Sequence, residues 1–177
     1  MKTQNNKSPG PSSLVEGLAE MHTAERELVV GLALLARIVN SKDFKTLLQT
    51  HRKETQGHVQ VVEDVAESLG EELPSKSCKP VTRLIKEALT VVAKKWNSPD
   101  LDQSLGGVAQ KIEQFEIDHY KKLCSLAKAA RKQHEFALLS SILTQEEMAH
   151  ELLGKIAIES QPLRKSVERV SLKRAKG

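Results

Sequence analysis

Glutamate and histidine side chains interrupt four apolar stripes of this chain, each near the middle of a long helical pattern. The stripes repeat in steps of three and four residues, which place their members on one face of a helix. The first contains Glu25 between Met21 and Leu28, where a core residue is expected. Unpaired buried carboxylates are costly, so acids that converge in a core need either histidine partners or a bound cation. The pattern therefore predicts a buried metal site.

The ionisable residues are of the types that non-haem di-iron and di-manganese sites use. Carboxylates supply hard oxygen ligands and can bridge two ions, and imidazole completes each coordination shell. The predicted metal ligands are Glu25, Glu54, His58, Glu113, Glu116, Glu147 and His150. Glu147 and His150 have the Glu-x-x-His spacing of di-metal helix bundles, whereas His58 follows Glu54 by four residues.

Three more polar residues of the stripes are predicted to support the ligands by hydrogen bonds: His51, Tyr120 and Glu146. Because Glu146 and Glu147 are adjacent, either one can be the inward acid. A single Glu/His pair at helical spacing is usually a solvated surface pair, but four sets at one level are poorly explained in that way. A buried Glu–His network without metal is the remaining alternative.

The stripes belong to four predicted helices, at about 13–39, 41–70, 98–131 and 135–160. Between the second and third of these lie a proline-containing loop and a shorter amphipathic stretch at 81–96. Aromatic residues make up only 3% of the chain, and strand-like alternation is missing. We therefore predict an all-α fold, a ferritin-like four-helix bundle whose long crossover carries an extra short helix. Each stripe has its acid near the helix midpoint, so the four acids should share one level.

Charge is distributed unevenly along the chain. The formal net charge is +4, but residues 162–177 contain six basic residues and one acid. We predict a disordered N-terminal tail at 1–13, a di-metal bundle at 14–160 and a basic, flexible tail at 161–177. Since the bundle itself is net acidic, the whole domain does not resemble a nucleic-acid binder.

The cysteines and the apolar runs indicate the cellular compartment. Cys78 and Cys124 stand in no metal-binding or redox spacing, which favours free thiols in a reducing environment. The N-terminus has no apolar signal core, and the longest apolar run, 28–36, is too short to span a bilayer. We expect a cytoplasmic protein with no membrane partner.

Several segments resemble the YciE/YciF family of bacterial ferritin-like stress proteins. They are MHTAEREL at 21–28, HRKETQGH at 51–58, the Lys-Ser-Cys-Lys around Cys78, QKIEQFEIDHY at 110–120 and TQEEMAH at 144–150. The resemblance covers about residues 14–157 and implies a homodimer with a carboxylate-bridged di-metal centre, often regarded as a ferroxidase. The long basic C-terminal tail is not typical of that family.

The residues and the resemblance together predict a di-iron oxidoreductase of the stress response. Two iron ions, or manganese ions, would be the cofactors, and O₂ or H₂O₂ the small-molecule substrate. The alternative is a non-catalytic helical scaffold whose basic tail binds nucleic acid or an acidic partner.

Overall fold

The computed structural model describes residues 11–159, and over this range the secondary structure consists of five helices joined by short connections. They are α1 (Pro11–Ile38), α2 (Lys42–Ser68), α3 (Lys79–Lys95), α4 (Leu101–Ala129) and α5 (Gln133–Glu159). The all-α prediction is therefore confirmed. The predicted tails, 1–13 and 161–177, lie almost entirely outside the described residues, as does any contact that the basic tail makes.

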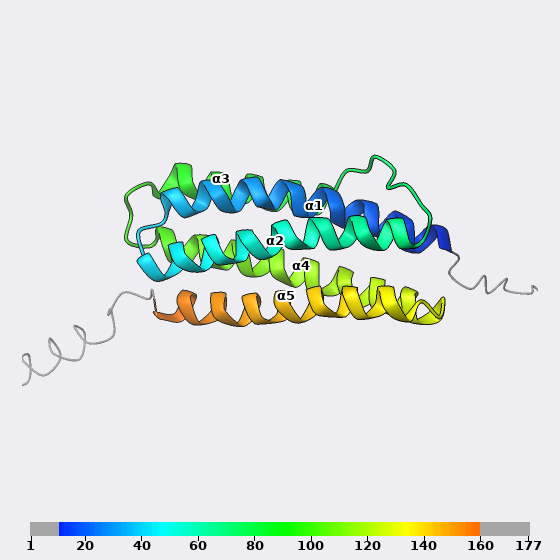
Figure 1. Cartoon of the computed structure of the whole chain (residues 1–177). Helices are drawn as coiled ribbons and strands as arrows, with labels where there is room; N and C mark the ends of the chain where they lie inside the picture. Colours follow the sequence, from blue (N-terminus) through cyan, green and yellow to red (C-terminus); the bar gives the residue numbers. More distant parts are fainter. Residues whose placement is uncertain (1–10, 160–177) are drawn as a thin grey trace, which may run out of the picture.

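The four long helices form a bundle, and α3 lies against its side (Figure 1). Helices α1 and α2 are antiparallel neighbours, and so are α4 and α5. The segment from Leu69 to Cys78 and helix α3 carry the chain along the bundle, so that α4 runs in the same direction as α2. This is the ferritin-like topology, with the extra short helix in the long crossover packed on α1 and α4.

Polar contacts hold the connections that set the helices in register. Ser41 caps α2, since its Oγ accepts a hydrogen bond of 3.3 Å from the backbone N–H of Phe44. The buried carboxylate of Asp102 on α4 accepts hydrogen bonds from the backbone N–H groups of Asn40, at 2.9 Å, and of Ser41, at 2.6 Å. The turn between α1 and α2 is therefore attached directly to the start of α4.

Two helices start two or three residues away from their predicted starts, and one predicted helix end is confirmed. Helix α1 begins at Pro11, before the start predicted at about residue 13. Helix α4 begins at Leu101, and Ser98 instead accepts a hydrogen bond from the backbone N–H of Asp100 in the preceding turn. Just after α2, Gly70 has a φ of +71°, the left-handed conformation expected of a glycine that ends a helix.

The core of the bundle is aliphatic on both sides of a polar layer, which is formed by the buried side chains of Glu25, His51, His58, Glu113, Glu116 and Glu146. Its most deeply buried members include Leu18, Met21, Leu105, Leu123 and Leu139. Within 11–159 no helix is both long enough and apolar enough to cross a membrane.

Candidate metal centre

Helices α1 and α4 present their ionisable residues to the interior as the sequence predicted. Glu25 on α1 and Glu113, Glu116 and Tyr120 on α4 are all buried. On α4 the four-residue step from Glu116 to Tyr120 keeps both side chains on the inner face. The Tyr120 hydroxyl donates a hydrogen bond of 2.5 Å to Glu25 Oε1, which joins the two helices at the polar layer.

Helix α2 is rotated relative to the predicted stripe. Its buried residues are Phe44, Leu48, His51, Thr55, His58, Val62, Val65 and Ala66. The prediction placed Glu54 inside, but its side chain is 38% exposed and contacts the outer nitrogen of His51. His58 is inside as predicted, and His51, expected only as a supporting residue, lies in the same buried layer.

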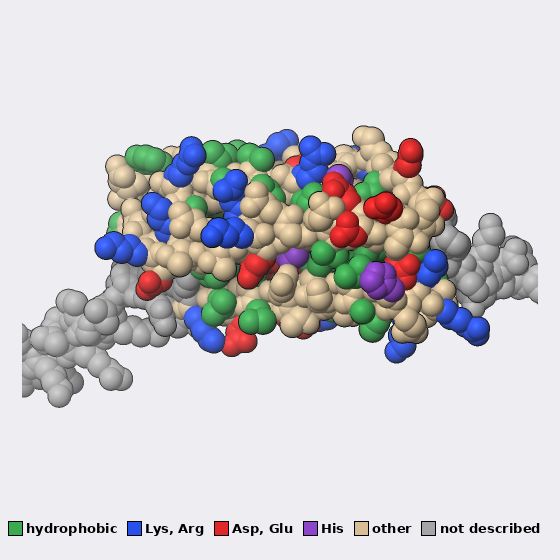
Figure 2. All heavy atoms as spheres, viewed as in Figure 1, with side chains coloured by type: hydrophobic (Ala, Val, Ile, Leu, Met, Phe, Trp, Pro, Cys, Tyr) green, Lys and Arg blue, Asp and Glu red, His purple; other side chains and the backbone are tan. Residues whose placement is uncertain are grey.

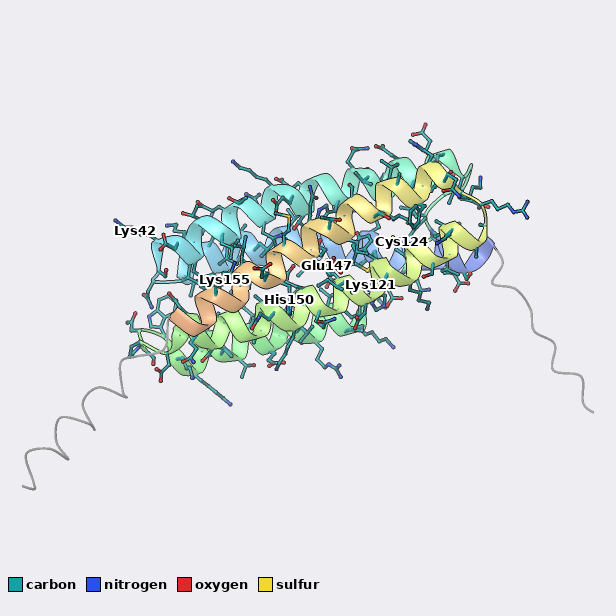
Figure 3. All side chains as sticks on the ribbon, turned by 90° about the horizontal axis from the view of Figure 1, so that it is seen from below. Lys42, Lys121, Cys124, Glu147, His150 and Lys155 are labelled. Carbon is teal, nitrogen blue, oxygen red and sulfur yellow. The ribbon has the colours of Figure 1, made fainter. Side chains whose placement is uncertain are left out.

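Helix α5 turns Glu146 inward and Glu147 outward. Glu146 is fully buried, whereas the Glu147 side chain is 49% exposed and pairs with Lys121 at 3.0 Å. Figure 3 shows Glu147 and His150 on the outer side of the bundle, where α4 and α5 meet. The expected inward orientation of Glu147 and His150 is therefore wrong.

The reason is the position of the buried stripe along α5. The stripe runs through Leu139, Ile142, Glu146, Ala149 and Leu153, in steps of three and four residues. The prediction of Glu147 and His150 as ligands rested on a stripe through Leu143 in place of Ile142, which is displaced by one residue. The presence of Ile142 and Ala149 on either side of Glu146 was the available signal.

The buried ionisable residues form two groups that share one carboxylate. His51, Glu113, Glu116 and Glu146 make the first group, and Glu25, His58 and Glu146 make the second. In each group one ligand atom per residue lies within 4.8 Å of all the others. The two oxygens of Glu146 face different histidines: Oε2 lies 3.7 Å from His51 Nε2, and Oε1 lies 2.8 Å from His58 Nδ1. Glu146 is thus positioned as a bridge.

Each histidine is oriented by a partner on its far side. His51 Nδ1 lies 3.3 Å from Glu54 Oε2, and His58 Nε2 lies 2.7 Å from Gln145 Oε1. Both partner atoms can only accept, so these ring nitrogens carry the proton and donate. When neutral, each imidazole therefore directs the lone pair of its other nitrogen toward the carboxylates, as a metal ligand requires.

The inner polar atoms lack the hydrogen bonds that burial normally demands. Seven such atoms are without a hydrogen-bond partner in the described part of the chain: Glu25 Oε2, His58 Nδ1, Glu113 Oε2 and both carboxylate oxygens of Glu116 and of Glu146. His58 Nδ1 and Glu146 Oε1 lie 2.8 Å apart as an ion pair. Buried groups of this kind are rare unless water or an ion satisfies them. These donor groups could therefore hold a metal ion.

The burial of the acids determines protonation in the metal-free protein. Burial raises the pKa of Glu116 well above its ordinary value, and the neighbouring carboxylates of Glu146 and Glu25 raise it further. Burial also raises the pKa of Glu113, to about 7, although His51 acts in the opposite direction. Burial alone would lower the pKa of His58, but Glu146 and Glu25 raise it to about 10. The layer therefore holds extra protons at neutral pH, which a bound cation would displace.

The sequence of this chain matches a known protein family. Residues 12–164 match the sequence profile of a family described as a domain of unknown function, DUF892. The chain belongs to this family. Protein YciF of Escherichia coli K12 is 28% identical over 144 residues, which cover 81% of this chain and 87% of YciF. The resemblance to the YciE/YciF proteins found in the sequence is confirmed.

Solved structures show the same fold. The crystal structure of the E. coli stress protein YciF superposes with a TM-score of 0.81 at 27% identity and covers 84% of this chain and 94% of that one. YcfI from Rhodopseudomonas palustris gives a TM-score of 0.79 at 24% identity, with 86% and 98% of the two chains covered. A Xanthomonas campestris protein gives 0.66 at 22% identity, with 94% and 98% covered. The latter two comparisons bear on the fold alone.

Proposed function

We propose that this DUF892 member is a di-metal carboxylate protein that binds two iron ions, or manganese ions, and oxidises Fe(II) with O₂ or peroxide. The observation that carries the proposal is the Glu146 carboxylate, whose two oxygens face two separate sets of unsatisfied ligand atoms. The assigned ligands are Glu25, His51, His58, Glu113, Glu116 and Glu146. When bound, two such ions supply one-electron redox changes at adjacent positions, which the side chains alone cannot.

The carboxylates set the charge that the ions meet. Glu25, Glu113, Glu116 and Glu146 converge in a layer closed to solvent, so their negative charge is little screened. Such a set favours the higher oxidation state of iron. Once all four acids are ionised, two histidines cannot compensate their charge, so the positive charge of bound ions would replace the protons that the metal-free layer holds.

The partners of the ligands fix their orientation. Tyr120 holds one oxygen of Glu25 and leaves the other directed at His58 Nδ1, 3.5 Å away. Burial raises the pKa of Tyr120 well above its ordinary value, and the negative charge of Glu25 adds to this effect, so the hydroxyl keeps its proton and remains a donor. Glu54 and Gln145 hold the two imidazoles in the same way. These contacts fix the donor atoms before any ion binds, which limits the reorganisation that binding requires.

Matched substitutions on α5 test the proposal. Anaerobic loading with Fe(II), desalting and elemental analysis should give two iron ions per chain. Glu146→Ala should lose both, because both groups share this residue, whereas Glu147→Ala should keep both. Equal metal content in the two variants, or a wild-type protein without bound metal, would refute the proposal. Circular dichroism of each variant controls for folding.

The same protein preparation can be used to identify the bound metal and to determine the oligomeric state. Anomalous scattering above and below the iron and manganese absorption edges distinguishes the two metals. Light scattering coupled to size-exclusion chromatography tests the homodimer that the family resemblance implies. Because E. coli YciF is described as a stress protein, we also propose a role in the stress response, where control of Fe(II) and peroxide is chemically consistent with the site.

A truncated variant distinguishes this proposal from the alternative of a non-catalytic scaffold. Removal of residues 162–177 should leave the metal content unchanged. If the scaffold interpretation were correct, the truncation would abolish binding to a nucleic acid or an acidic partner, and that binding would weaken steeply with salt before truncation.

A further inference from the structure

A small apolar cavity, partly open at the surface, lies directly beside the candidate metal centre. Its volume is about 80 Å³, and within residues 11–159 His51 and Glu113 are the only ionisable residues that line it. The rest of the lining is provided by apolar side chains and one glycine from α1, α3 and α4, among them Leu28, Leu32, Leu35, Ala88 and Ile112. The cavity therefore joins an aliphatic space to two assigned ligands of the first group.

A larger surface groove between α1 and α3 leads to this cavity. The groove has a volume of about 670 Å³ and shares four lining residues with the cavity: Gly31, Leu34, Ile85 and Leu89. Leu34 and Leu89 stand at the boundary, and they are 47% and 52% exposed. In Figure 2 hydrophobic side chains are visible along the edge of the molecule where α3 lies. The groove and the cavity thus adjoin at these four residues, and the cavity extends from there to His51 and Glu113.

The chemistry of the lining selects what can occupy the cavity. A buried water needs two to four polar partners, and apolar cavities without them stay dry. Hydrogen peroxide, which also needs several hydrogen bonds, would lose them along the aliphatic part of the path. An apolar cavity of about 150 Å³ can hold a molecule as large as benzene, so one of about 80 Å³ suits a smaller apolar molecule or a xenon atom. Dioxygen has this size and polarity.

We infer that this cavity is the access route and holding site for dioxygen on its way to His51 and Glu113. The inference rests on the proposed function, and it identifies O₂, in place of peroxide, as the oxidant that reaches the centre by this path. The overall reaction balances as 2 Fe(II) + O₂ + 2 H⁺ giving 2 Fe(III) + H₂O₂. Gly31 is the residue that keeps the path open, because no side chain occupies the boundary between groove and cavity at that position.

The experiment uses two variants in which a larger side chain fills part of the cavity or its boundary, and one matched control. A Cβ at Gly31 would meet only Ile85 Cγ1, at 4.0 Å, which is an ordinary contact, so Gly31→Leu can add its side chain to the cavity boundary. Ala88→Val narrows the cavity from α3 and serves as a second variant in case the first does not fold. At Gly107, on α4, a Cβ would meet nothing within 4 Å, so Gly107→Leu repeats the glycine-to-leucine change outside the cavity.

Xenon is the probe, since it is apolar and its position can be seen in a pressurised crystal without any reaction. Xenon should occupy the cavity in the wild-type protein and in Gly107→Leu, and its occupancy should be lost in Gly31→Leu and reduced in Ala88→Val. A wild-type cavity without xenon would overturn the inference. Full xenon occupancy in both filled variants would overturn it as well.

Stopped-flow oxidation of iron-loaded protein then tests the route. Oxidation by O₂ should be several-fold slower in Gly31→Leu, because its side chain narrows the boundary between groove and cavity, and unchanged in Gly107→Leu. Oxidation by added H₂O₂ should be the same in all variants. An unchanged O₂ rate, or equal slowing with both oxidants, contradicts the assignment. A protein that binds no iron would refute the proposed function, and the xenon measurement would still decide whether the cavity takes an apolar molecule.

Discussion

Two segments with the same kinds of side chain behave differently in this bundle. The α2 segment from His51 to His58 directs both of its histidines into the core. Of the ionisable residues in the α5 segment from Glu146 to His150, only Glu146 is directed inward, and Glu147 pairs with Lys121 at the surface. The comparison shows that helical spacing tells which residues share a face, whereas the neighbouring helices decide which face is buried.

The pairs within each segment illustrate the difference. His51 and His58 are seven residues apart, about two turns, and both lie in the buried stripe. Glu147 and His150 are three residues apart and also share a face, but that face points away from the core (Figure 3). Their spacing is that of a ligand pair, but they lie on the side of the helix that faces away from the core. The α2 segment should therefore matter for metal binding, and the outer part of the α5 segment should not.

The largest expected effect on metal content comes from replacing either buried histidine of α2 with alanine. His51→Ala and His58→Ala should each lose at least one of the two bound ions, because each removes the only imidazole of its group. His150→Ala should keep both ions. Elemental analysis after anaerobic Fe(II) loading measures the difference. A loss of metal in His150→Ala equal to that in the α2 variants would mean that α5 binds metal in the way its motif first suggested.

An intermediate effect is expected in the pH dependence of the metal-free protein. Groups whose pKa is raised on folding contribute stability below their unfolded value and lose it as the pH rises through the folded value. For Glu113 this range runs from 4.5 to about 7, and for His58 from 6.5 to about 10. Glu54 and Glu146 have lowered pKa values, so they lose their contribution only in acid. The free energy of unfolding should therefore fall between pH 6 and pH 9, by on the order of 5 kcal/mol at about 1.4 kcal/mol per pH unit for each group.

Urea denaturation at the two pH values, with a chelator present, measures this fall. Glu116→Gln should reduce it, because burial raises the pKa of Glu116 and the amide does not titrate. Glu147→Gln, at the outward position of α5, should leave it intact. A stability that rises from pH 6 to pH 9 in the wild-type protein would show that the inner acids are not protonated on folding.

The smallest effect concerns residues that orient a histidine. Glu54→Gln should weaken metal affinity by about tenfold, since such partners of metal-binding histidines typically contribute ten- to a hundredfold. Glu63→Gln is the matched control, because Glu63 lies on the same helix and contacts His22 at 2.8 Å on the surface. Competition with a coloured chelator measures both affinities. If Glu54→Gln removed a whole ion, Glu54 would be a ligand itself, as the sequence first indicated.

The sequence by itself determined the helical fold and the α1 and α4 sides of the polar layer. Along α1, each residue of the predicted stripe from Leu14 to Leu32 is buried, Glu25 included. Along α4 the same holds from Leu105 to Leu123, because the apolar residues there define one face clearly. The crossover and its short helix followed from proline residues, Gly70 and an amphipathic stretch, all of which are local signals.

Only the tertiary structure decided the rotation of α2 and α5. Helix α2 has apolar doublets, Leu47–Leu48 and Val61–Val62, and α5 has the acidic doublet Glu146–Glu147. Adjacent residues are about 100° apart around a helix, so either member of a doublet can belong to the buried stripe. The sequence therefore allows two positions of the stripe that differ by one residue. The choice between them depends on which side the other helices cover, and this is a property of packing that no local pattern records. That choice made Glu146 the shared carboxylate and left Glu147 in solvent.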